Sequence, residues 1–151
     1  YNADPEDARF FASMNIGVPK EALLDCGAFS ERFRTAEDRE LCDRWRHGGR
    51  RLVYEPRAQI GHSHHLSFRS FCRQHLGYGR GAASYHRIRQ ERSSGTIREE
   101  SSFHRALPGL VLPRLRELPV SRAVAQLGAL ALWQVMNFAG YVAGRRELGR
   151  R

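Results

Sequence analysis

The alternation of apolar and polar positions divides the chain into two parts of different character. Residues 1–66 carry short apolar runs separated by glycine, proline and polar residues, a pattern typical of a mixed α/β unit with short strands and helices. Glycines stand where the two expected helices should end. The expected strands are 9–14, 51–54 and 59–62, and the expected helices are 20–26 and a segment beginning near Ala36.

Residues 67–92 predict one long amphipathic helix. Apolar or small side chains recur every three or four positions, which places them on one face of a helix. Ser67 stands at the position of an N-terminal cap. The following residues, 93–102, are polar and predict a linker. The stripe consists of Phe68, Phe71, Cys72, His75, Leu76, Gly79, Ala82, Ala83 and His86.

Residues 103–151 predict a helical extension that is either membrane-associated or packed on the protein. The run 123–144 contains no charged residue and is bracketed by arginines. It is long enough to cross a bilayer, which takes about 20 apolar residues. Three amide side chains weaken that interpretation, and Gly140 and Gly144 would suit a packed face. A helix packed on the protein, one lying in a membrane interface and a spanning helix therefore stay open.

Composition changes this picture in two respects. The formal net charge is +9, which favours anionic partners, yet 24 of the 25 cations are arginine because Lys20 is the only lysine. A GC-rich genome produces the same bias, and the spacings of the common nucleic-acid-binding motifs are absent, so we expect no nucleic-acid partner. The three cysteines lie far apart, which excludes a disulfide framework and a zinc ribbon and favours a reducing, cytoplasmic compartment.

Three short segments carry candidate chemistry, each with a structural alternative. Glu37 and Asp38 fall in the first turn of an expected helix, where acids either complement the helix dipole or act as a proton acceptor. His62 and His64 would share one face if the segment is a strand, because alternate residues of a strand point the same way. They are either metal ligands or solvated side chains. The glycine-rich run 77–81 implies a close approach, either of another helix or of an anionic group.

Five short motifs follow one another in an order and spacing typical of one enzyme family. Over residues 9–87 they resemble the C-terminal half of a family 2 glycosyltransferase of the GT-A type. The sequence departs from the family's loop pattern at Ala28, in place of a glycine, and at Ser30, in place of an aspartate. The motifs are Asn15, the loop 23–33, the acidic helix 37–44, the segment 53–62 with Pro56, Ala58 and His62, and the glycine helix 77–81.

The resemblance implies a fold class and a domain organisation. Residues 1–66 would be the acceptor-side half of a GT-A catalytic domain, an α/β unit completing a mixed sheet, and a helical C-terminal region would follow. The nucleotide-binding half, with its D-x-D motif, would lie upstream of Tyr1, so this chain alone is expected to be inactive.

The resemblance also implies residue roles. Asp38 would match the catalytic base of an inverting transfer, and Glu37 would shape the acceptor site beside it. Arg44 would brace the helix or the acid pair, or reach the donor's diphosphate. His62 would match a ligand of a divalent metal, Mg or Mn, whose other ligands are expected upstream. The loop around Phe29 would border the acceptor site.

The implied partners are a nucleotide-sugar donor and a cell-envelope, lipid-linked or polysaccharide acceptor. The apolar C-terminal run and the excess of arginine favour work at the inner face of the plasma membrane. The alternative function is a non-catalytic basic module that binds a membrane or nucleic acid.

Overall fold

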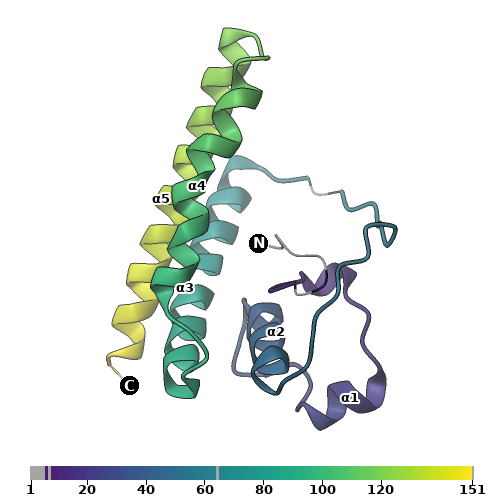
Figure 1. Ribbon diagram of the computed structural model, residues 1–151. Coiled ribbons are helices and arrows are strands. Elements are labelled where there is room, and N and C mark those ends of the chain that lie inside the picture. Colours follow the sequence, from purple (N-terminus) through teal and green to yellow (C-terminus); the bar gives the residue numbers. More distant parts are fainter. Residues whose placement is uncertain (1–5, 7, 64, 151) are drawn as a thin grey trace.

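The computed structural model describes residues 6, 8–63 and 65–150, and every regular element in this part of the chain is a helix (Figure 1). Helices α3, α4 and α5 form an elongated column, with α1, α2 and the connecting segments beside it. In chain order the elements are the 3₁₀ turn η1 (Ser13–Asn15), α1 (Lys20–Asp25), α2 (Glu37–His47), α3 (Phe68–Arg92), α4 (Ile97–Leu115) and α5 (Val120–Leu148).

The predicted GT-A mixed sheet is wrong for this structure. The described residues of the segments expected as strands form no strand, and 13–15 form a 3₁₀ turn. A strand is stabilised by a ladder of hydrogen bonds to a neighbouring strand. In the described part of the chain, a long-range backbone bond runs from Ala8 N, just before the first of these segments, to Leu52 O in the second, at 2.9 Å. One such bond makes no ladder, and the segments stay extended without forming a sheet.

Helix α3 begins at Phe68, as the sequence predicts, although Phe68, the first member of the predicted apolar face, is 74% exposed. Ser67 caps it, because its hydroxyl accepts a hydrogen bond from Ser70 N at 3.2 Å. The helix ends at Arg92, followed by Ser93 in the left-handed conformation at φ 56°. Helix α4 then begins at Ile97, inside the range expected as a linker, so the connection spans only 93–96.

Helices α3 and α5 pack against each other through glycines. A Cβ on Gly79 would fall 2.7 Å from Tyr141 N, and one on Gly140 would fall 2.9 Å from the carbonyl carbon of Leu76. A Cβ on Gly144 would fall 2.9 Å from that of Ala83. These separations are shorter than any side chain tolerates, so the two backbones approach this closely only because glycine occupies each position.

The neighbouring glycines of α3 receive the segment that leads into α2. Thr35 donates a hydrogen bond to the carbonyl oxygen of Gly77 at 3.0 Å, and a Cβ on Gly81 would fall 2.6 Å from the carbonyl oxygen of Thr35. Gly77 and Gly81, four residues apart, share this face of the helix, whereas Gly79 faces α5. The glycine-rich run therefore allows two close approaches on different faces of α3, and one of them positions the start of α2.

A small core lies beside α2. Ala8, Cys42 and Leu52 are buried, with Phe11 and Trp45 among the side chains packed around them. Burial raises the pKa of the Cys42 thiol to about 11. This cysteine is therefore a protonated packing residue at neutral pH.

Helix α5 contains the uncharged run 123–144 and contacts α4 as well as α3. Gln134 and the His104 ring nitrogen lie 3.2 Å apart, and the His104 ring stacks on Trp133. Among the described residues, no helix combines the length and the apolar character needed to cross a bilayer.

Two glycines of α5 provide a matched test of the packing against α3. We expect Gly140→Ala to destabilise the protein by about 1–3 kcal/mol, because the methyl group must push α3 and α5 apart. A Cβ on Gly128 would meet no neighbouring segment within 4 Å, so Gly128→Ala should stabilise the helix by about 0.5–1 kcal/mol. Urea unfolding followed by far-ultraviolet circular dichroism measures both. Equal gains in stability would contradict the close approach.

Candidate functional site

The carboxylate of Asp38 is held at the N-terminus of α2. Its Oδ1 accepts a hydrogen bond from Arg39 N at 2.8 Å, and its Oδ2 accepts one from Ser13 N at 3.3 Å. The side chain is partly exposed and lies at the positive end of the helix dipole. Glu37 precedes it in the same turn and is also partly exposed. An oriented and accessible carboxylate is what proton abstraction requires.

A groove of about 720 Å³ lies next to the turn η1, whose Ser13 N binds the Asp38 carboxylate. Ala12 and Asn15, on either side of Ser13 and Met14, are among the residues that line the groove, whereas Asp38 is not. Asn15 Nδ2 donates to the carbonyl oxygen of Ala58 at 2.7 Å and so joins two walls of the groove. An apolar wall with a few polar groups is typical of sites that bind small molecules. The aromatic lining residues are Phe10, Phe11, Trp45 and Tyr54.

Arg44 braces the helix and the loop after α1. Its guanidinium donates to the carbonyl oxygens of Cys26 and Ala28, the latter at 2.6 Å. The same group makes a two-point contact with Glu40, through Nε to Oε1 and Nη2 to Oε2, both at 2.9 Å. Carbonyls at the end of a helix lack partners within it, so a cation there is stabilising. Contact with a donor diphosphate, the other role expected for Arg44, stays a prediction.

Ala28, which stands where the family pattern has a glycine, adopts a backbone conformation that is unfavourable for alanine. Its φ is 51°, in the left-handed region that favours glycine. Arg44 binds its carbonyl oxygen and holds the loop in this conformation. In the same loop Phe33 is buried, whereas Phe29 stays exposed.

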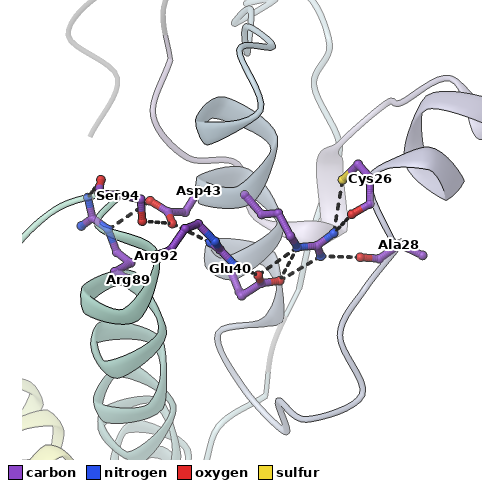
Figure 2. A network of polar contacts seen from close by, with 8 residues as sticks. Cys26, Ala28, Glu40, Asp43, Arg89, Arg92 and Ser94 are labelled. Atoms are coloured by element: carbon purple, nitrogen blue, oxygen red, sulfur yellow. Dashed lines mark hydrogen bonds and ion pairs between the residues drawn. The ribbon is translucent and has the colours of Figure 1, made fainter.

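A network of buried charges joins α2 to the end of α3 (Figure 2). Arg92 contacts Glu40 at 2.6 Å and Asp43 at 2.8 Å. Arg89 contacts Asp43 at 3.0 Å, and the Ser94 hydroxyl donates to the same carboxylate at 2.6 Å. The Glu40 side chain is only 3% exposed. The network therefore fixes α2, and with it Asp38, against the helical column.

The charge state of Glu40 follows from its partners. Burial acts to raise the pKa of this carboxyl, but the hydrogen bonds and charges of Arg44 and Arg92 outweigh burial. The pKa of Glu40 consequently lies below its ordinary value, and the side chain is ionised at neutral pH.

His62 lies exposed on the extended segment that follows Pro56. His64, its expected partner, lies outside the described residues. Across residues 6, 8–63 and 65–150, no three His, Cys, Asp or Glu side chains gather as a metal ion requires. The role of His62 as a metal ligand stays a prediction.

Sequence reasoning singled out Asp38 and Arg44 but missed the contacts of α2 with Arg89 and Arg92. A signal was present, because Glu40 and Asp43 lie three residues apart on one helix and the two arginines lie three apart on another. Such matched spacing permits pairing between helices, but it does not select the partner helix.

The chain is similar in part to two curated relatives. No family model matches it, and no solved structure matches it significantly. Over 74 residues, 49% of this chain, it is 39% identical to proteins named "Pre-mycofactocin glycosyltransferase" from two strains of Mycobacterium tuberculosis, CDC 1551 / Oshkosh and ATCC 25618 / H37Rv. The match covers 16% of the length of each relative. The similarity is thus to part of a glycosyltransferase.

Proposed function

We propose that this chain belongs to a protein that transfers a sugar from a nucleotide-diphosphate donor to a hydroxyl group of an acceptor. The observation that carries the proposal is the 39% identity to proteins named as glycosyltransferases. The Asp38 carboxylate, which Ser13 N holds next to the lining residue Ala12, supports it independently, since glycosyl transfer to a hydroxyl needs a base beside the acceptor.

Asp38 is the base in this proposal. Its carboxylate takes the proton of the acceptor hydroxyl while that oxygen attacks the anomeric carbon from the side opposite the diphosphate. The bond from the anomeric carbon to the diphosphate breaks, the nucleoside diphosphate leaves, and the configuration inverts. Glu37, in the same turn of α2, shapes the acceptor side.

The acceptor lies against the aromatic wall of the groove. Phe11, Trp45 and Tyr54 provide flat apolar surface, and Asn15 provides a polar contact. A glycan or a lipid-linked glycan presents both apolar faces and hydroxyl groups. No contact with the donor is assigned to the described residues.

The described residues do not by themselves make a site for a divalent metal. His62 is exposed, and no group of three His, Cys, Asp or Glu side chains in the described part of the chain could hold a metal ion. The proposal therefore assigns no metal-dependent step to these residues.

The direct test uses the complete protein encoded by the gene, incubated with a panel of nucleotide-sugars and hydroxyl-bearing acceptors. Mass spectrometry should detect an acceptor that gains one sugar, together with an equal amount of nucleoside diphosphate. Proton NMR of the new linkage should show inversion relative to the donor. Binding of nucleotide-sugars without transfer to any acceptor, or no binding at all, would overturn the proposal.

A further inference from the structure

The outer face of α5 carries a continuous apolar stripe. Its spacings of three and four residues place the members within about 40° of one direction around the helix, over a length of about 27 Å. Val120 is 80% exposed and Phe138 is 70% exposed. The stripe consists of Val120, Val124, Leu127, Ala131, Val135 and Phe138, and all six are exposed.

The opposite face of α5 is already used by packing. Gly140 and Gly144 contact α3, and Trp133 and Gln134 contact His104 of α4. The uncharged run 123–144 thus presents apolar side chains on two sides of α5, although only one side is covered in the described structure. Helices of this composition are normally covered on every side, by protein or by lipid.

Two arginines flank the C-terminal end of the stripe. Arg145 and Arg146 lie on either side of its C-terminal continuation, and both are exposed. Arg122 lies near the start of the stripe along the helix but on the opposite side of it. Glu147, the acid that follows the two arginines, lies 3.4 Å from Arg80 of α3. The C-terminal end of the stripe is therefore positively charged.

We propose that this face of α5 docks on an anionic lipid bilayer, with the helix lying in the plane of the interface. The stripe would enter the boundary between headgroups and acyl chains, and the arginines would contact lipid phosphates. Crossing the bilayer is not the mode, because no described helix has the necessary length and apolar character.

A second copy of the chain fits this face less well. Parallel pairing of two α5 helices through the stripe would place Arg145 and Arg146 beside their counterparts, which brings like charges together. An anionic surface would neutralise these charges instead. This docking does not depend on the proposed sugar transfer.

Vesicle co-sedimentation of the 151-residue chain tests the proposal. We expect binding to phosphatidylcholine vesicles that contain phosphatidylglycerol, little binding to phosphatidylcholine alone, and weaker binding as salt rises. Arg145→Gln with Arg146→Gln should reduce binding roughly tenfold or more. Val135→Ser with Phe138→Ser should reduce it by a similar factor.

Matched controls lie on α3. Phe68 is 74% exposed, so Phe68→Ser removes an equally exposed phenyl group away from the stripe, and Arg69→Gln with Arg73→Gln removes two exposed charges. Both controls should keep most of the binding, and circular dichroism should show unchanged helix content in every variant. Three outcomes would overturn the proposal: no binding of the unchanged chain to anionic vesicles, undiminished binding of the stripe variant, or a dimer in solution that Phe138→Ser dissociates.

Discussion

Replacing Asp38 with asparagine in the complete protein should lower the rate of sugar transfer by at least ~100-fold. General-base catalysis contributes about 10²–10⁴-fold to such reactions, and an amide accepts no proton at neutral pH. Asparagine keeps the size of the side chain and one acceptor oxygen, so the contacts with Ser13 N and Arg39 N are only partly lost. The effect should fall on kcat with little change in KM, because the base acts in the transition state.

Two other acids, Asp25 and Glu37, serve as comparisons for Asp38. Asp25→Asn alters an exposed carboxylate at the end of α1 and should leave transfer within about twofold. Glu37→Gln should change KM for the acceptor more than kcat, since Glu37 is assigned a role in shaping the site. Normal transfer by the Asp38→Asn protein, with unchanged circular dichroism, would remove Asp38 as the base.

The helices were predictable because their signals are local. Ser67 marks the start of α3, Gly48 follows the end of α2, and the apolar period of 3.6 residues extends through 68–92. Helical hydrogen bonds join residues four apart, so each helix carries most of its own determinants. The start of α2 was less well specified, because Thr35 bonds to Gly77 instead of capping the helix.

The predicted strands did not form, because a strand depends on contacts with a distant segment and not on local signals. The segments 9–14 and 51–54 have suitable composition, but a strand exists only where another strand satisfies its backbone groups. The segment after Tyr54 forms a turn, in which the Glu55 carboxylate accepts hydrogen bonds from the backbone and side chain of Arg57. The mixed sheet was predicted from the resemblance to a GT-A family, and the described residues do not form it.

The glycine-rich run 77–81 was predictable only in part. The sequence showed that three glycines within a helix are costly and that something must approach closely. It did not identify the neighbours, Thr35 on one face and Asn137 with Tyr141 on another, because they lie far away along the chain. Tertiary contacts of this kind depend on how helices assemble, which no local pattern specifies.

Replacing Glu40 with glutamine should destabilise the protein by about 3 kcal/mol. Removing one charge from a buried ion pair leaves its partners uncompensated, which typically costs about 3–5 kcal/mol. Arg44 and Arg92 are 22% and 18% exposed, so water offsets part of that loss and favours the lower end of the range. For a chain of this size the midpoint of thermal unfolding should fall by roughly 10 °C. Differential scanning calorimetry at pH 7 measures the change.

Acidification should reduce the difference between the two proteins. The pKa of Glu40 is lowered on folding, so its contribution to stability is complete above the unfolded pKa and is lost as the pH falls through the folded pKa. The unchanged protein should therefore lose stability on acidification more steeply than the Glu40→Gln variant. Urea midpoints measured between pH 7 and pH 3 should converge toward the acid end.

Glu91 provides the matched control for Glu40. It pairs with Arg87 at 3.0 Å with the same four-residue spacing as Glu40 and Arg44, but its side chain is 61% exposed. Glu91→Gln should therefore cost less than about 1 kcal/mol. If Glu40→Gln proved equally mild, the network in Figure 2 would not hold α2 against α3. The placement of Asp38 would then depend on the Thr35 contact with Gly77 and Gly81, and Gly81→Ala would become the more damaging change.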